Sequence, residues 1–380
     1  MKLLFSQFIS LITTVTLLSG CVINGISDDH RVFRYNASAG ITTLDPAHAR
    51  SLEIMWAVDA IYDGLVELSP DLEVIPSIAE SWDWVEGGVV FHLRKGVLFS
   101  PALDVPGLEK GRELVASDVV YSLERLRDPV VASPGGWILD AVMEDGIIAI
   151  NDSTVKISLK NDFPPFLGLL TTPYASIVAP EAVEGRGVKF RFHPAGTGPF
   201  KVAWSVEDVA LVLHKNTDYW EKDDVGNSLP YLDAVHIDFV PDMGSEYLGL
   251  IQGRYDFISG LHPAYMEDLM TQEGTLAQKH KDNLELKRVP FLKTDYVGIL
   301  IDSISDTRVR KALSLSIDRA GIAKNLRRGS VLPADRFIPP SMLGNRLHSS
   351  PEYNLALASE LLVLAGYPGG AGLPVIELST

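Results

Sequence analysis

Apolar residues alternate with polar ones at several places along the chain, and this spacing predicts strands. Residues 155–159 and residues 235–239 each carry apolar side chains at their first, third and fifth positions. Side chains two positions apart point to the same face of a strand, so each series predicts one buried and one exposed face. The short run at 32–36 is a third predicted strand, and we expect the folded body to begin there.

Other stretches have the three- and four-residue spacing that predicts helices. Apolar side chains in residues 117–126 share one helical face, with Ser117 as the expected N-cap and Pro129 beyond the end. The other expected helices lie at 52–62, 306–319, 318–328 and 355–365. Strands and helices follow one another without strict alternation, which favours a mixed α/β or α+β fold.

The beginning of the chain has the pattern of a secretion signal. Lys2 precedes an apolar run at 3–18, which is shorter than the roughly 20 residues needed to cross a bilayer, and small residues follow it. The alternative is a buried or membrane-spanning helix, but the flanking residues fit export better. We therefore expect residues 1–20 to be a signal peptide.

Cys21 is the only cysteine, and it stands directly after the expected signal. Residues 18–21 read Leu-Ser-Gly-Cys, which resembles the lipobox of bacterial lipoproteins, whose cysteine becomes the lipid-modified first residue. A lone thiol forms no internal disulfide, and the alternative is an unpaired cysteine without a role. We expect lipid attachment at Cys21, a linker at 21–31 and a protein tethered to a membrane by its acyl chains.

Charge and length narrow the possible partners. The formal net charge is -16 at pH 7, from 33 basic and 49 acidic side chains. Such a surface repels phosphate backbones and offers no basic stripe, so we expect no nucleic acid partner. The chain is long enough for two or more lobes, at about 100–200 residues per domain.

The sequence lacks the usual patterns of catalytic and metal sites. It contains neither a G-x-S-x-G elbow nor an H-E-x-x-H pair. The S-x-x-K spacing at 153–156 falls on a predicted strand, where Ser153 and Lys156 would point to opposite faces. Gly-Thr-Gly at 196–198 lacks the third glycine of a dinucleotide fingerprint and the lysine of a P-loop. We expect no catalytic residue, no metal site and no cofactor.

Several stretches are long and unusual enough to identify a family when they are taken together. They are YDGLVEL at 62–68, PSIAESW at 76–82, FHLRKGV at 91–97, ASDVVYSL at 116–123, GTGPF at 196–200, NTDYW at 216–220, VRKALSLSIDR at 309–319 and AGYP at 365–368. In number and order these stretches resemble the family 5 extracellular solute-binding proteins, the dipeptide, oligopeptide and nickel binders of ABC transporters.

This resemblance runs from about Val32 to the last residue. It implies an α/β, type II periplasmic-binding-protein-like fold of two lobes, with an extra subdomain inserted in lobe one. The implied sections are lobe one at 32–76, the inserted subdomain at 77–184, lobe one resumed at 185–287, and lobe two at 288–380. Family members continue beyond the segment at 372–378, so we expect a C-terminally truncated chain with an incomplete lobe two.

The function implied by the resemblance is transport, without catalysis. A lipoprotein of this kind captures a peptide between its lobes, closes on it and delivers it to the permease of an ABC uptake transporter. We expect a monomer at the periplasmic or cell-surface face. The first alternative is another solute, such as a nickel complex, haem or a sugar, and the second is an exported hydrolase.

The implied architecture also points three loops into the ligand cleft. They are Ala39, Gly40, Ile41, Thr42 and Thr43 after the first strand, Thr197 and Gly198, and Tyr296, Val297 and Gly298 at the entry to lobe two. Trp137 is a further aromatic candidate. Each loop has a structural alternative: the first caps a strand, the Thr-Gly-Pro turn shapes a crossover, and Tyr296 belongs to the core.

Overall fold

The computed structural model describes residues 31–288, 291–334, 336–339, 342 and 353–376. The predicted signal peptide, Cys21 and nearly all of the linker lie outside the described residues. The chain forms two units, which divide between Ile258 and Ser259. The predicted start of lobe two at residue 288 lies within the second unit, and the predicted section boundaries stay predictions.

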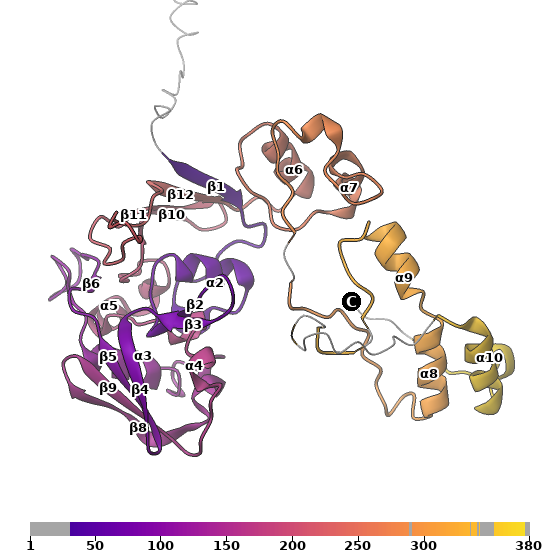
Figure 1. Cartoon of the computed structure of the whole chain (residues 1–380), viewed down its shortest axis with the longest axis horizontal. Helices are drawn as coiled ribbons and strands as arrows, with labels where there is room; N and C mark the ends of the chain where they lie inside the picture. The colour runs from indigo at the N-terminus through magenta and orange to yellow at the C-terminus, as the bar shows by residue number, and fades with distance from the viewer. Residues whose placement is uncertain (1–30, 289–290, 335, 340–341, 343–352, 377–380) are drawn as a thin grey trace, which may run out of the picture. The chain divides into compact units, whose positions relative to one another are not determined.

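The first unit contains a four-stranded main sheet in the order β1-β12-β11-β10 (Figure 1). Its strands are β1 (Val32–Asn36), β10 (Phe200–Val206), β11 (Ala210–Lys215) and β12 (Ala234–Asp238). β1 and β12 are parallel, with Val32 opposite Ala234, whereas β11 is antiparallel to both of its neighbours. Val235, Ile237 and Phe239 are buried, which confirms the predicted alternation.

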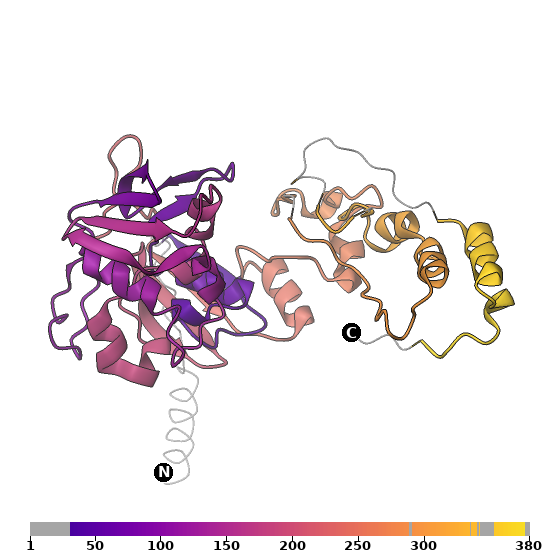
Figure 2. The ribbon, with the colours of Figure 1, turned by 90° about the horizontal axis from the view of Figure 1, so that it is seen from below.

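A second four-stranded sheet is antiparallel throughout, in the order β4-β5-β9-β8. Its strands are β4 (Ala79–Val85), β5 (Gly88–Leu93), β8 (Val142–Asn151) and β9 (Thr154–Leu159). Val155, Ile157 and Leu159 are buried, as their spacing predicted. Helix α3 (Ala116–Glu124) packs on β8 and β9, and Figures 1 and 2 show it lying against this sheet.

Shorter elements complete the first unit. Two-stranded ribbons are formed by β2 (Val66–Leu68) with β3 (Val74–Pro76) and by β6 (Leu98–Phe99) with β7 (Arg112–Glu113). The remaining helices are α2 (Leu52–Asp59), α4 (Phe166–Leu169), α5 (Pro180–Arg186) and α6 (Met243–Ile251).

Helix α2 begins where it was predicted but ends three residues earlier. Ser51 caps its start by accepting a hydrogen bond from the backbone of Ile54. Beyond its end, the carbonyl oxygens of Ala60 and Ile61 accept hydrogen bonds from Phe200 and Gly198, at 3.0 and 2.9 Å. A longer helix would use these carbonyl oxygens for its own hydrogen bonds. Because Gly198 and Phe200 bind them instead, the helix ends here and the chain turns.

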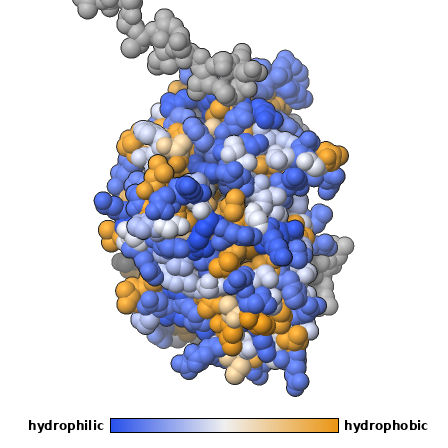
Figure 3. All heavy atoms as spheres, turned by 90° about the vertical axis from the view of Figure 1, so that its left-hand side faces the viewer, coloured by the Kyte–Doolittle hydropathy of each residue, from blue (hydrophilic) through white to orange (hydrophobic). Residues whose placement is uncertain are grey.

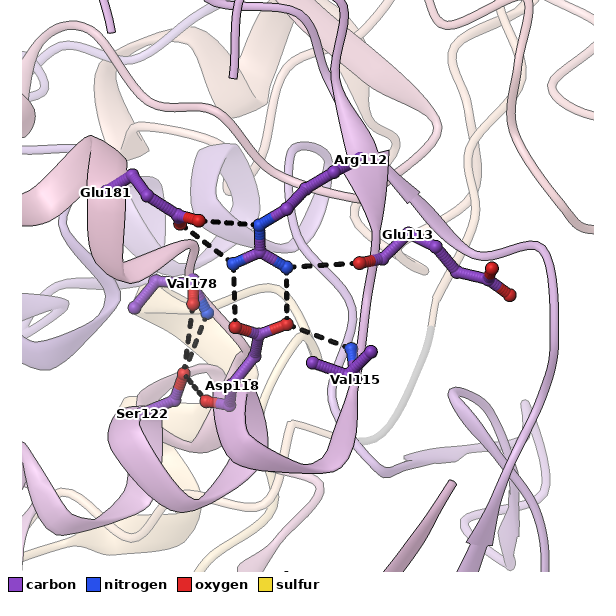
Figure 4. A network of polar contacts seen from close by, with 7 residues as sticks. All are labelled: Arg112, Glu113, Val115, Asp118, Ser122, Val178 and Glu181. Carbon is purple, nitrogen blue, oxygen red and sulfur yellow. Dashed lines mark hydrogen bonds and ion pairs between the residues drawn. The ribbon is translucent and has the colours of Figure 1, made fainter. Parts of the chain in front are cut away.

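The predicted N-cap of α3 was wrong. The helix begins at Ala116, one residue before Ser117, and the capping residue is Val115. The carboxylate of Asp118 accepts the backbone N–H of Val115 at 2.9 Å, and Arg112 holds that carboxylate from the other side (Figure 4). An acid in the first turn therefore satisfies the backbone N–H of the capping residue, and no side chain of the capping residue accepts a bond from the helix.

The second unit is built mainly of helices and loops in its described part. Its helices are α7 (Pro263–Leu269), α8 (Thr307–Leu315), α9 (Arg319–Gly321), the π-helical turn Ile322–Leu326 and α10 (Leu355–Leu364). Asp306 caps α8, but the helix predicted to reach residue 319 stops at Leu315, because Asp318 caps a new turn by accepting from Gly321. α10 packs on α8 and confirms the helix predicted at 355–365.

The face of the molecule in Figure 3 is mainly hydrophilic, with apolar residues in small groups. Beneath the surface of the first unit, one apolar core joins side chains from Tyr35 to Phe239. Within the described residues, no helix has the length and apolar character needed to span a membrane.

Candidate functional site

The first candidate loop leaves the end of β1 and is fixed at several points. The N–H of Ala37 donates to the carbonyl of Asp238 at 2.8 Å, and the N–H of Leu44 donates to Arg191 at 2.6 Å. Ile41 and Thr43 are buried, and the hydroxyl of Thr43 accepts the N–H of Asp45 at 3.0 Å. Ile41 and Thr43 therefore anchor the loop, and the exposed residues are Ala39 and Thr42, with Gly40 half-buried.

A charge pair holds the C-terminal part of this loop. The carboxylate of Asp45 receives two hydrogen bonds from the guanidinium of Arg125, at 2.7 and 2.5 Å, and a further one from the N–H of Ala47. Burial alone would raise the pKa of Asp45, but the hydrogen bonds and charge of Arg125 outweigh it and lower that pKa. Asp45 is thus ionised at neutral pH and ties the loop to the end of α3.

The structure brings the segment that carries Trp137 to the short helical turn Pro46–His48, which follows the first loop. Nε2 of His48 lies 2.9 Å from the carbonyl of Val131, and the hydroxyl of Ser133 donates to the carbonyl of Ala47 at 2.6 Å. Trp137 is the second residue of the short helical turn Gly136–Leu139, whose last two residues are buried, while its own side chain is 51% exposed. An indole is thus presented to solvent on a segment that is bound to the turn after the first loop.

Thr197 and Gly198 occupy the interior, packed against the turn after α2. A Cβ on Gly198 would lie 2.5 Å from the backbone carbon of Ile61, so no larger residue fits there. The hydroxyl of Thr197 donates to the buried carboxylate of Asp63 at 2.6 Å. Asp63 also accepts hydrogen bonds from Tyr219 and Trp220, at 3.2 and 3.3 Å. Thr197 thus contacts Asp63, and its role toward a ligand stays a prediction.

Asp63 and Glu67 line a cavity of about 180 Å³. Burial raises the pKa of Asp63 to about 6, although its three hydrogen-bond donors oppose the shift. Burial and the nearby carboxylates of Glu221 and Asp63 raise the pKa of Glu67 to about 7. Neither acid is among the predicted site residues, because the YDGLVEL stretch does not indicate which donors from distant segments reach its carboxylates.

Tyr296, Val297 and Gly298 lie in the second unit and are exposed. Tyr296 packs against Phe337 with ring centroids 5.1 Å apart, but its side chain is 68% exposed, so the alternative that it belongs to the core is wrong. The structure describes these residues outside helices and strands.

Chemically, the first loop and the Trp137 segment offer exposed backbone and an aromatic face. Backbone N–H and C=O groups bind extended chains, and an indole binds flat or apolar groups. Among the described residues, no group of three or more His, Cys, Asp or Glu side chains is arranged to hold a metal ion.

Comparison with known proteins defines the class of protein to which this fold and these segments belong. Residues 73–380 match the family described as bacterial extracellular solute-binding proteins, family 5 Middle. The chain belongs to this family.

Its relatives include binding proteins for small peptides. The glutathione-binding protein GsiB of Shigella flexneri is 28% identical over 337 residues, which are 87% of this chain and 61% of that protein. GsiB of Escherichia coli strain K12 matches with the same identity and coverage. The chain therefore spans 61% of the length of these curated relatives.

Solved structures agree with the fold. The periplasmic binding protein DppA of Helicobacter pylori, solved with the peptide STSA, is 27% identical with a TM-score of 0.74, covering 89% of this chain and 66% of DppA. MoaA of A. tumefaciens R10, solved with mannopinic acid, is 25% identical with a TM-score of 0.68, covering 89% of this chain and 66% of MoaA. The predicted α/β fold of the type II, two-lobed periplasmic binding proteins is confirmed.

Proposed function

We propose that this chain is the solute-capturing component of an ABC uptake transporter and that its ligand is a peptide. Membership of the family supports the transport role, and the names of GsiB and DppA support a peptide ligand. The ligand is held between the two predicted lobes, which close on it and present it to the permease. The chain acts as a monomer and catalyses no reaction.

The observation that carries the proposal is the construction of the first loop. Its buried residues and the Asp45–Arg125 pair fix its course, while Ala39 and Thr42 remain exposed. A fixed loop keeps its backbone groups in place before the ligand arrives, which lowers the entropy lost on binding. Backbone contacts of this kind bind peptides of many sequences.

Isothermal titration calorimetry with the tetrapeptide Ser-Thr-Ser-Ala and with glutathione tests the ligand. We expect binding of at least one peptide, and Trp137→Ala should weaken it by about tenfold, as expected for an exposed aromatic that contacts a ligand. Trp204→Ala is the matched control, since Trp204 is 47% exposed on β10 and belongs to no candidate loop. If Trp137→Ala and Trp204→Ala bound the peptide with equal affinity, Trp137 would not be part of the binding site.

A second candidate ligand is mannopinic acid, because MoaA, which is 25% identical to this chain, was solved with it. Titration with mannopinic acid under the same conditions separates the two classes. Binding of mannopinic acid without binding of either peptide would replace the peptide proposal while leaving the transport role in place.

We also propose that the protein is an exported lipoprotein, anchored through Cys21 at the periplasmic or cell-surface face of a membrane. The position of Cys21 after Leu-Ser-Gly at the end of an export signal supports this. Cys21→Ser should move the protein from the detergent phase to the aqueous phase in detergent partitioning. Retention of that variant in the detergent phase would exclude acylation at Cys21 as the anchor.

A further inference from the structure

An open groove of about 540 Å³ lies in the first unit, and neither the candidate loops nor Trp137 contribute to it. Its lining residues come from β4, β5, the loop after β5, the turn before β9 and the segment after β11. They are Glu80, Ser81, His92, Leu93, Arg94, Lys95, Ser153 and Trp220.

Arg94 is held in one orientation at this groove. Its backbone N–H donates to the carbonyl of Ile78 at 2.9 Å, and its side-chain Nε donates to the carbonyl of Ser77 at 2.7 Å. The guanidinium lies over the ring of Trp220, 4.8 Å from its centroid. The indole N–H of Trp220 in turn donates to Asp63, so the surface on which the guanidinium rests is also fixed.

The two terminal nitrogens of Arg94 have no partner among the described residues, in hydrogen bonds or ion pairs. This distinguishes Arg94 from Arg112, Arg125 and Arg186, whose terminal nitrogens all bind carboxylates or carbonyls. A guanidinium presents its N–H groups in a planar fork that matches the oxygens of a carboxylate or phosphate. The contacts at Nε and at one face leave the two terminal nitrogens available to a ligand.

Other lining groups fit a negatively charged ligand. Lys95 adds a second positive charge and makes no ion pair within the described part of the chain, and Ser81 supplies a hydroxyl donor. The hydroxyl of Ser153 already donates to Asn151 at 3.2 Å. His92 is engaged with Asp83 at 3.0 Å. Glu80 is the one acidic residue of the lining, so the groove carries a local excess of positive charge on a chain whose net charge is -16.

We propose that this groove binds a small molecule through a carboxylate or phosphate group, with Arg94 as the two-point partner and Lys95 as the second cation. The site lies on the first unit, separate from the loops of the proposed peptide site, and it does not depend on the proposed function.

Nuclear magnetic resonance of the arginine Nε–Hε groups in the full chain tests the proposal. Inorganic phosphate and succinate are titrated separately at constant ionic strength, and the Nε–Hε signal of Arg94 should shift in a saturable way with at least one of them. Saturation by phosphate alone assigns a phosphate ligand, and saturation by succinate alone assigns a carboxylate ligand. The signal of Arg50, an exposed arginine outside the groove, is the internal control.

Substitutions of the charged lining residues should change the affinity for the anion in predictable directions. Lys95→Gln should weaken binding about two- to fivefold, and Glu80→Gln should strengthen it by a similar factor, because each changes one exposed charge beside the anion. Arg94→Lys keeps the charge but loses the fork, and should weaken binding by about tenfold. Lys110→Gln, an exposed lysine outside the groove, is the matched control and should change nothing.

Two results would overturn the proposal. The first is an Arg94 signal that moves no more than that of Arg50 with either anion. The second is saturable binding that is unchanged in both Lys95→Gln and Glu80→Gln. These two exposed residues form no described side-chain bonds, so the variants are expected to fold and the test holds even if Arg94→Lys is destabilised.

Discussion

At the scale of single residues, the buried carboxylate of Asp63 joins three distant parts of the first unit. Its partners Thr197, Tyr219 and Trp220 come from segments 134 to 157 residues further along the chain. A buried carboxylate without donors is unfavourable, so each of these hydrogen bonds stabilises the contact between the turn after α2 and the main sheet. The same network holds Trp220 beneath Arg94.

Thr197→Val should therefore destabilise the protein. The change keeps the shape of the side chain but removes the hydroxyl that donates to Asp63, and a hydrogen bond to a charged group contributes about 1.5–3 kcal/mol. Urea denaturation at pH 8 should show a loss of that size, whereas Thr197→Ser, which keeps the donor, should lose clearly less. Equal losses in the two variants would mean that packing, and not the hydrogen bond, is what Thr197 provides.

The acids of the small cavity make stability depend on pH. The ordinary pKa values of 3.8 for Asp63 and 4.5 for Glu67 rise to about 6 and about 7 in the folded protein. The folded state therefore keeps these protons to higher pH than the unfolded chain does. Their stabilising contribution is complete below about pH 4 and is lost as the pH rises through 6 and 7.

Between pH 5 and pH 8 the free energy of unfolding of Glu67→Gln should fall by about 1 kcal/mol less than that of the unmodified protein. This figure is less than the full pKa shift implies, because Glu67 is partly exposed and solvent screens its charge. Glu86→Gln, at the exposed turn between β4 and β5, is the control. A pH profile of Glu67→Gln that coincides with that of the unmodified chain would contradict this account.

These residues could be predicted from the sequence only in part. Thr197 and Gly198 are predicted site residues from the GTGPF stretch, but Asp63, the partner of Thr197, lies in another stretch, and neither stretch by itself indicates the contact. Conversely, the loop after β1 was selected as a whole, whereas burial divides it into anchoring residues, Ile41 and Thr43, and exposed ones, Ala39 and Thr42. Contacts between distant segments decide which loop residues are buried and which are exposed, and these contacts cannot be predicted from a single sequence.

At the scale of elements, one arginine joins β7 to two helices (Figure 4). Arg112 donates two hydrogen bonds of 2.7 Å to Asp118 in the first turn of α3, and bonds of 2.7 and 2.8 Å to Glu181 in the first turn of α5. Its remaining donor contact goes to the carbonyl of Glu113 at 3.0 Å. Both acids also lie at positive helix ends, which favour negative charge.

Arg112→Gln should destabilise the protein by about 3 kcal/mol, because it leaves the buried carboxylate of Asp118 without its counter-charge. Glu181→Gln should cost about 1 kcal/mol or less, since the side chain of Glu181 is 33% exposed. Guanidinium denaturation of both variants measures the difference. If the two losses were equal, Asp118 would not depend on Arg112 in the way the geometry indicates.

The spacing of apolar residues predicted which helices and strands exist, but it did not predict where they begin and end. The strands at 155–159 and 235–239 and the helix at 355–365 appear where their patterns placed them. Hydrogen bonds from Gly198 and Phe200 set the end of α2. The start of α3 is set by Asp118, which accepts the N–H of Val115 and is itself bound by Arg112. Ends of this kind depend on contacts with distant residues, and the spacing of apolar residues does not indicate those contacts.

At the scale of the whole molecule, the two units differ in how much apolar surface they bury. The large core lies entirely within the first unit, between Tyr35 and Phe239. The described second unit has few buried apolar side chains, among them Val309 and Ala358, and many exposed ones, including Leu326 and Leu364. Burial of apolar surface is the main stabilising term in folding, so the first unit holds most of the stability.

Residues 31–258, produced alone, should therefore unfold in one cooperative thermal transition, and residues 259–380 alone should not. Differential scanning calorimetry and near-ultraviolet circular dichroism measure both fragments. A sharp transition in the fragment 259–380, or its absence in 31–258, would show that stability is distributed differently from the buried core.

The pairing of β1 with β12 has a consequence for how the protein is made. The bond between Arg31 and Asp233 at this edge spans 202 residues of chain. A ribosome adds about 5–20 residues per second, so roughly 10–40 s separate the appearance of β1 from that of its partner. During this interval Phe33 and Tyr35 stand on a strand with no neighbour, and such unpaired edges favour aggregation. The strand that completes this edge is therefore absent for most of the time that the first unit is being synthesised.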